Sequence, residues 1–195
     1  MPGNVAGVLL AAGSGSRLGQ PKALVMLAGQ SLAARGIALL RAGGADPVVV
    51  VTGAAELADR PDGVACVHNP DWPSGMGSSL AAGLAAVPPG CDAAVVALAD
   101  QPLVGPESVR RLIAAYQGGA SVAVACYDGQ PRNPVLIGRE HFGEVVALAA
   151  GDVGARPFLR AHPDLIARVE CADTGRPDDI DSPEDLARVQ ELLAT

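Results

Sequence analysis

Short apolar segments that alternate with amphipathic segments are the feature that most limits the fold of this chain. Seven of them are typical of strands, and most are apolar throughout rather than at every second residue. Parallel strands that are covered by helices on both faces have this composition, because neither face meets water. The expected strands are residues 5–10, 48–52, 64–67, 94–98, 122–126, 135–137 and 165–169.

Patterns typical of helices lie between these strands and after the last one, at residues 31–42, 78–86, 106–117, 140–148, 155–161 and 183–193. The last helix has a clear start, because Ser182 can cap it, Pro183 fits its first position and acidic residues follow. Alternating strands and helices predict an α/β fold, a doubly wound and mostly parallel sheet with helices on both faces. We expect residues 1–195 to form a single domain.

Composition limits the setting and the partners of the chain. No apolar run approaches the roughly 20 residues of a membrane-spanning helix, and the amino terminus lacks the pattern of a signal peptide, so we expect a cytoplasmic protein. The net charge of −7, with no basic stripe, argues against nucleic acid as a partner. The four widely spaced cysteines contain no C-x-x-C pair, which argues against a zinc or redox motif.

Lys22 is the only lysine in the chain, and the glycine-rich segment before it predicts a phosphate site. A compact ammonium differs most from a planar guanidinium where a point charge must follow a phosphate through a reaction. Small residues at the end of the first expected strand let backbone N–H groups approach a ligand. The segment is not a P-loop, and it is not a dinucleotide fingerprint, because Leu18 stands where the third glycine should be.

Asp100 is the first candidate for a metal ligand near this phosphate site. It follows an apolar strand and precedes Pro102, so its carboxylate should emerge at the carboxyl edge of the sheet, close to Lys22. A hard oxygen ligand there suits Mg²⁺, which is usually held by one or two carboxylates and substrate phosphates. The alternative is that Asp100 only stabilises the following turn. Asp181, just before the last expected helix, fits a role in the helix cap.

The glycine-rich segment resembles the signature of the nucleotidyltransferase superfamily, Leu-Ala-Ala-Gly-x-Gly-x-Arg-x-Gly-x-x-Lys, which is complete from Leu10 to Lys22. Further segments, in the same order, resemble the MobA-like branch that adds a cytidylyl group to the molybdenum cofactor. They are Asn69-Pro70-Asp71-Trp72, Gly75-Met76-Gly77-Ser78-Ser79-Leu80, Asn133-Pro134-Val135-Leu136, Gly151-Asp152-Val153-Gly154-Ala155-Arg156 and Asp179-Ile180-Asp181-Ser182-Pro183-Glu184-Asp185. The resemblance spans nearly the whole chain.

This resemblance implies a Rossmann-like nucleotidyltransferase fold and a role for individual residues. Lys22 and Arg17 would balance charge on the phosphates, and Asp100 and Asp181 would hold Mg²⁺, with Asp179 as a neighbouring or capping residue. The residues expected at the nucleotide are Leu10, Ala11, Ala12, Gly13, Asn69, Gly77, Ser78 and Ser79. Those expected at the acceptor are Asn133, Pro134, Asp152 and Arg156.

The implied reaction is transfer of CMP from CTP to the terminal phosphate of a molybdopterin-type cofactor, with release of pyrophosphate and a molybdenum hydroxylase as a further partner. Ala12 favours CTP, because the guanylyl branch usually has a glycine there, which makes room for a purine. Arg132 stands where the branch usually has glycine, which can reshape the acceptor pocket.

Three alternatives to the cytidylyltransferase stay open. The first is another nucleotidyltransferase, which would make a guanylyl cofactor, an isoprenoid precursor or a nucleotide sugar. The second is an NAD(P)-dependent oxidoreductase of the same branch, against which the incomplete dinucleotide fingerprint argues. The third is a non-catalytic chaperone that binds the cofactor and hands it to a molybdenum hydroxylase.

Overall fold

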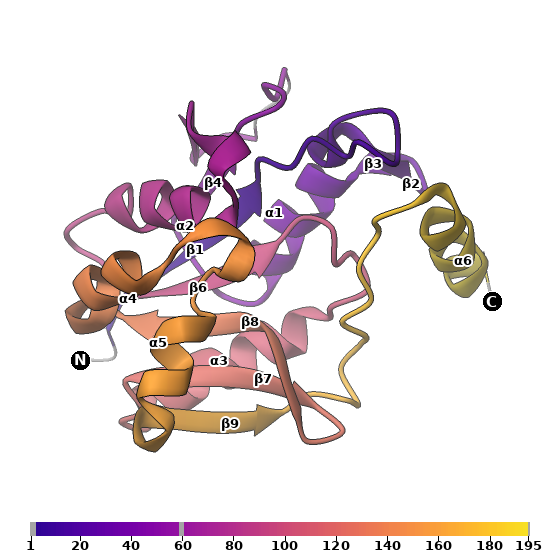
Figure 1. Ribbon diagram of the computed structural model, residues 1–195. Coiled ribbons are helices and arrows are strands. Elements are labelled where there is room, and N and C mark those ends of the chain that lie inside the picture. Colours follow the sequence, from indigo (N-terminus) through magenta and orange to yellow (C-terminus); the bar gives the residue numbers. More distant parts are fainter. Residues whose placement is uncertain (1–2, 59–60, 195) are drawn as a thin grey trace.

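The computed structural model describes residues 3–58 and 61–194 and shows a layered α/β architecture (Figure 1). A seven-stranded sheet has the strand order β5-β4-β1-β6-β8-β7-β9. Its strands are β1 (Val5–Ala11), β4 (Val48–Thr52), β5 (Val64–His68), β6 (Ala93–Leu98), β7 (Val122–Tyr127), β8 (Gln130–Gly138) and β9 (Ile166–Glu170). A separate hairpin pairs β2 (Met26–Leu27) with β3 (Gln30–Ser31).

The large sheet is mostly parallel, as the sequence predicts. β1 pairs in parallel with β4 and β6, and β7 pairs in parallel with β9. β8 is the exception, because it runs antiparallel to both β6 and β7. The chain turns directly from β7 into β8 at Asp128 and Gly129, which both have positive φ and form a two-residue hairpin turn. β8 is longer than the expected residues 135–137. Its first half is polar and exposed, so the apolar pattern indicated only its second half.

The α-helices in the described residues are α1 (Leu32–Ala42), α2 (Met76–Ala85), α3 (Pro106–Gln117), α4 (Phe142–Leu148), α5 (Arg156–Ala161) and α6 (Pro183–Ala194). α1 and α3 cover one face of the sheet, and α2, α4 and α5 cover the other (Figure 1). None of these helices is long and apolar enough to cross a membrane.

Strand β1 shows why the strands are apolar throughout. Its side chains alternate between the two faces of the sheet, so Leu9 belongs to the core under α1 and α3. Its neighbours Val8 and Leu10 belong to the core under α2, α4 and α5. All seven residues of β1 are therefore buried, which is the condition that the apolar pattern predicted.

Helix α6 packs apart from these two cores, beside the β2–β3 hairpin (Figure 1). Its residue Val189 and the preceding Ile180 are fully buried. They share a small hydrophobic cluster with Val25, Leu27 and Leu32. The last helix is thus docked on the segment that follows the glycine-rich loop.

The carboxyl ends of the parallel strands bring the expected site residues to one edge of the sheet. β1 ends at Ala11, directly before the glycine-rich loop. β6 ends at Leu98, shortly before Asp100, and β5 ends at the residue before Asn69. Ligands of open α/β sheets bind at this edge, and the strand order places β1 next to β6 there.

Gly83 of α2 offers a test of how tightly this helix packs on the sheet. A Cβ at Gly83 would lie 2.5 Å from Cγ1 of Val8 and 3.0 Å from Cγ2 of Val51, whereas a Cβ at Gly143 of α4 would meet nothing within 4 Å. We expect Gly83→Ala to lower the free energy of unfolding, because overpacking costs about 1–3 kcal/mol and outweighs the gain in helix propensity. The matched change Gly143→Ala should raise it by about 0.5–1 kcal/mol. Urea unfolding measures both, and equal stabilisation by the two changes would contradict the tight packing of α2.

Candidate active site

The glycine-rich loop after β1 folds back on itself and brings Lys22 beside the end of the strand. The backbone N–H of Lys22 donates to the carbonyl of Gly13 (3.2 Å), and the N–H of Leu18 donates to the carbonyl of Gly15 (2.8 Å). Gly15 has a φ of +59°, and a Cβ there would lie 2.0 Å from the carbonyl oxygen of Gln20. Only glycine fits this turn.

The tip of the loop presents backbone donors. Within the described part of the chain, the N–H groups of Ser14, Gly15 and Ser16 make no hydrogen bond. Successive free N–H groups in a turn form a concave site for anions. The phosphate site that the sequence predicts at this loop stays a prediction, and these free N–H groups are the donors that it would use.

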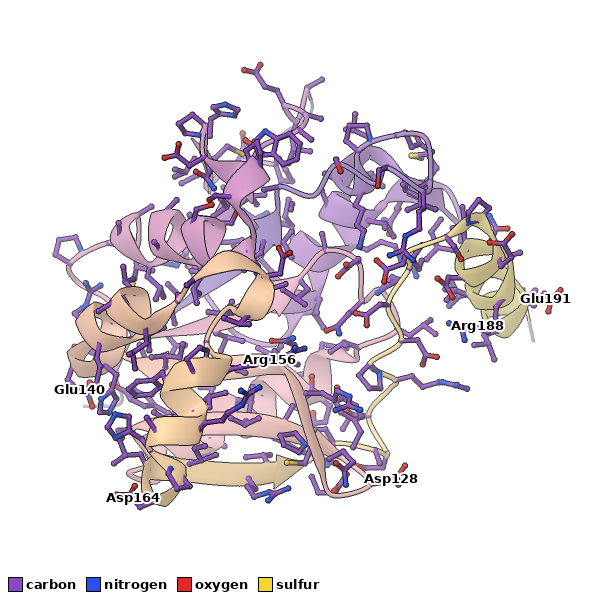
Figure 2. All side chains as sticks on the ribbon, viewed as in Figure 1. Asp128, Glu140, Arg156, Asp164, Arg188 and Glu191 are labelled. Carbon is purple, nitrogen blue, oxygen red and sulfur yellow. The ribbon has the colours of Figure 1, made fainter. Side chains whose placement is uncertain are left out.

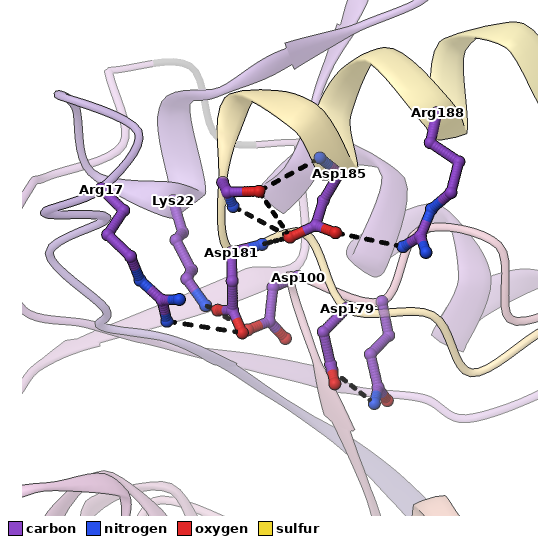
Figure 3. Close-up of polar contacts among 9 residues, drawn as sticks. Arg17, Lys22, Asp100, Asp179, Asp181, Asp185 and Arg188 are labelled. Carbon is purple, nitrogen blue, oxygen red and sulfur yellow. Dashed lines mark hydrogen bonds and ion pairs between the residues drawn. The ribbon is translucent and has the colours of Figure 1, made fainter.

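Two carboxylates hold the ammonium of Lys22 (Figure 3). Its Nζ donates to Oδ2 of Asp100 at 2.6 Å and to Oδ1 of Asp181. Arg17 adds a longer ion pair, with 3.8 Å between its Nη2 and Oδ2 of Asp181. The side chains of Lys22 and Asp100 are 19% and 20% exposed, whereas that of Arg17 is 71% exposed. The predicted meeting of Lys22 and Asp100 at one edge is thus present.

Burial and charge act in opposite directions on Lys22. Burial lowers the pKa of its ammonium, but the attraction and hydrogen bonds of Asp100 and Asp181 outweigh this effect and hold the pKa above its ordinary value. Lys22 is therefore protonated at neutral pH. It can serve as a fixed positive charge in the site and not as a general base.

Asp181 is available to the site because other residues cap α6. Oγ of Ser182 accepts a hydrogen bond from the N–H of Asp185 (3.2 Å), and Oδ2 of Asp185 accepts from the N–H of Ser182 (3.0 Å). This reciprocal pair is a capping box. Oδ2 of Asp185 also accepts from the N–H of Asp181 (3.1 Å). The side chain of Asp181 is left to point at Lys22 (Figure 3).

A cleft of about 310 Å³ opens beside the paired charges. It is bounded by the glycine-rich loop, the end of β6 and the segments around the start of α2. Trp72, Pro73 and Met76 supply apolar wall. The expected site residues that line the cleft are Leu10, Ala11, Ala12, Gly13, Lys22, Ser79, Asp100 and Asp152.

Asn69 and Ser78 are not among the described residues that line the cleft, but Asn69 contacts Ser79, which does line it. Asn69 is only 3% exposed, and its Nδ2 donates to Oγ of Ser78 (2.9 Å) and Oγ of Ser79 (3.0 Å). Its Oδ1 accepts from the N–H of Asp71 (3.0 Å), so every polar atom of the side chain has a partner. Asn69 thereby fixes Ser79 at the wall of the cleft.

Asp152 reaches the start of α2 from a distant part of the chain. It lies in the short helix η4 (Gly151–Val153), and its Oδ1 accepts from the N–H of Met76 (3.3 Å). α2 has no side-chain cap from its own N-cap residue, so this remote carboxylate pairs one of the free N–H groups of the first turn. Gly77 permits the segment before η4 to approach the start of α2 closely, because a Cβ at Gly77 would lie 3.1 Å from the backbone of Ala149.

Asn133, Pro134 and Arg156, which were expected at the acceptor, are not among the described residues that line this cleft. Asn133 and Pro134 lie in β8. Arg156 is the first residue of α5 and lies over the sheet (Figure 2). Their contact with an acceptor stays a prediction.

Residues 7–166 match the family described as the MobA-like NTP transferase domain. Nicotine blue oxidoreductase of Paenarthrobacter nicotinovorans is 38% identical over 95% of this chain and 96% of that protein. Molybdenum cofactor guanylyltransferase of Rhodobacter capsulatus is 31% identical over 97% of this chain and 96% of that protein.

Solved structures show the same architecture. Rv0371c from Mycobacterium tuberculosis H37Rv superposes with a TM-score of 0.83 at 28% identity, over 98% of this chain and 100% of that one. Its complex with manganese gives a TM-score of 0.77 at 27% identity, over 98% and 100% of the two chains. With its Rossmann-like nucleotidyltransferase fold and a family match over most of its length, the chain belongs to the MobA-like NTP transferase domains.

Proposed function

We propose that the chain transfers CMP from CTP to the terminal phosphate of a molybdopterin-type molybdenum cofactor and releases pyrophosphate. The observation that carries the proposal is the ammonium of Lys22, held by Asp100 and Asp181 beside a loop with free N–H groups. A triphosphate needs backbone donors, a point charge and oxygen ligands for a metal ion, and all three stand together here.

The chemistry asks the protein mainly for alignment and charge. An oxygen of the acceptor phosphate forms a bond to the α-phosphorus of CTP, and the bond between that phosphorus and the bridging oxygen breaks as pyrophosphate leaves. The acceptor phosphate is already an anionic nucleophile, so no general base is needed. Lys22 and Arg17 would stabilise the charge that develops on the α-phosphate and on the leaving pyrophosphate.

Asp100 and Asp181 would hold the divalent cation, which we propose is Mg²⁺. Their carboxylates already converge on one cationic atom, Nζ of Lys22. Within residues 3–58 and 61–194, no group of three or more His, Cys, Asp or Glu residues could hold a metal ion. The other ligands would therefore be phosphate oxygens and water, which is usual for Mg²⁺. The ion, when bound, would neutralise charge on the phosphates. The manganese complex of Rv0371c supports a divalent cation in this family.

Oxidoreduction is the second candidate, because nicotine blue oxidoreductase is similar along nearly the whole chain. The position of Leu18 argues against it, since a dinucleotide fingerprint needs glycine there. A transferase that uses GTP is the nearest variant of the proposal, given the similarity to molybdenum cofactor guanylyltransferase. A molybdenum hydroxylase, which would receive the product, remains part of the proposal.

Pyrophosphate release is the first prediction from this proposal. Protein incubated with Mg²⁺, the molybdopterin cofactor and each nucleoside triphosphate should release pyrophosphate with CTP. Lys22→Arg should lower kcat by about 100-fold or more, because a planar guanidinium cannot place one nitrogen against both carboxylates and the phosphates. The control Arg110→Lys changes an exposed cation of α3 and should act like the wild type. No pyrophosphate with any triphosphate, together with oxidation of NADH or NADPH by an acceptor dye, would favour the oxidoreductase.

Base selection by Ala12 is the second prediction. Ala12 lines the cleft, and its methyl group would be lost in Ala12→Gly, which makes room for a purine. We expect the ratio of kcat/KM for CTP to that for GTP to fall by about tenfold in this variant, since one methyl group gives modest discrimination. The only tryptophan, Trp72, also lines the cleft, so its fluorescence gives an independent measure of nucleotide binding.

A second alanine provides the control for this change. The backbone N–H of Ala54 donates a hydrogen bond to the carbonyl of Ala12 (3.2 Å). Ala54 is not among the described residues that line the cleft. Ala54→Gly should therefore keep the wild-type ratio. A ratio that is the same in the wild type and in Ala12→Gly would show that this loop does not select the base.

A further inference from the structure

The chain between β9 and α6 passes along the carboxyl edge of the sheet and reaches the candidate active site (Figure 1). We call residues 171–182 the C-terminal strap. The strap lies beyond residue 166, where the family match ends, and yet it carries Asp181. Its backbone is tied to the loop after β6, because the N–H of Arg176 donates to the carbonyl of Leu103 (3.0 Å).

Gln101 connects the strap to the end of β6 directly beside the site. The side chain of this residue is buried, and its Nε2 donates to Oδ1 of Asp179 (2.8 Å) and to the carbonyl of Pro177 (3.4 Å). One residue further along the strap, the N–H of Ile180 donates to the carbonyl of Asp100 (2.8 Å). Two adjacent residues of the strap therefore bind two adjacent residues of the loop, and this fixes the register between them.

Asp179 is an exposed residue of the strap whose carboxylate is held from the loop after β6. Its Oδ1 accepts the hydrogen bond of Gln101, whose own side chain is only 5% exposed. Loss of either partner would remove this contact between the strap and the loop.

We propose that Gln101 and Asp179 are positioning residues that set the carboxylate of Asp181 against Lys22. The clamp, meaning the hydrogen bond from Gln101 to Asp179, acts two residues before Asp181. The residue between, Ile180, is fully buried, so the short segment has anchors at both positions before Asp181. The inference rests on the proposed function only in treating Asp181 as part of the reacting site.

The reactivity of Lys22 tests the clamp without any substrate. Because the chain has a single lysine, its modification by an amine-directed acylating reagent can be followed in one peptide by mass spectrometry. Asp181→Asn defines the rate when Asp181 no longer holds the ammonium. Asp179→Ala and Gln101→Met should each raise the rate about threefold or more above the wild type, toward that of Asp181→Asn.

Asp179→Asn separates position from charge. It keeps the oxygen that accepts the hydrogen bond of Gln101 and removes the negative charge. We expect its Lys22 to react within about twofold of the wild-type rate. In the transferase assay, Asp179→Ala and Gln101→Met should lower kcat about tenfold and leave KM for CTP nearly unchanged, since the walls of the cleft are intact.

Asp178→Asn is the matched control on the same strap. Asp178 pairs with Arg176 at 2.9 Å and with Arg188 of α6 at 3.8 Å, and not with Gln101 or Lys22, so this variant should behave like the wild type in both assays. Wild-type reactivity of Lys22 in both Asp179→Ala and Gln101→Met would overturn the inference. Equal effects of Asp179→Asn and Asp179→Ala would also overturn it, because charge would then be the cause.

The two assays also distinguish this inference from the proposed function. If the clamp variants expose Lys22 while the wild-type protein releases no pyrophosphate, the clamp stands and the proposed reaction is wrong. If Asp179→Ala does not fold, as judged by circular dichroism, the comparison of Gln101→Met with Asp179→Asn decides the question on folded proteins.

Discussion

The ammonium of Lys22 joins three parts of the chain that are far apart in sequence. It belongs to the loop after β1, and it binds Asp100 after β6 and Asp181 in the C-terminal strap. Two carboxylates this close to each other repel when no cation lies between them. The two ion pairs of Lys22 therefore explain why Asp181 of the strap can lie close to Asp100 at the edge of the sheet.

Most of the sheet could be predicted because burial on both faces leaves a direct mark on the sequence. β1 and β4 are buried at every residue and are apolar or small almost throughout. The direction of β8 left no such mark, because its first half is polar and a strand of either direction has the same pattern. The pair Asp128 and Gly129 is a known signal for a two-residue hairpin and could have indicated it. The β2–β3 hairpin has two residues in each strand, too few for any periodicity.

The site was predictable where one short segment carries several constraints at once. The loop from Leu10 to Lys22 combines a strand end, glycines and the single lysine, and its resemblance to a family signature identified it. The clamp between Gln101 and Asp179 joins residues 78 positions apart, and the contact of Asp152 with α2 spans 76 positions. Nothing local marks either partner of such contacts, so they became visible only in the folded chain.

The pKa of Lys22 is the most direct test of the arrangement at the centre of the site. Lysine labelled with ¹³C at the ε position would give a single lysine signal in the NMR spectrum, because the chain has one lysine. If Asp100 and Asp181 hold the ammonium, its pKa will lie above the ordinary value of 10.5 and will fall in Asp100→Asn and in Asp181→Asn. A pKa below 10.5 in the wild type, unchanged in both variants, would show that burial dominates and that the carboxylates do not hold Lys22.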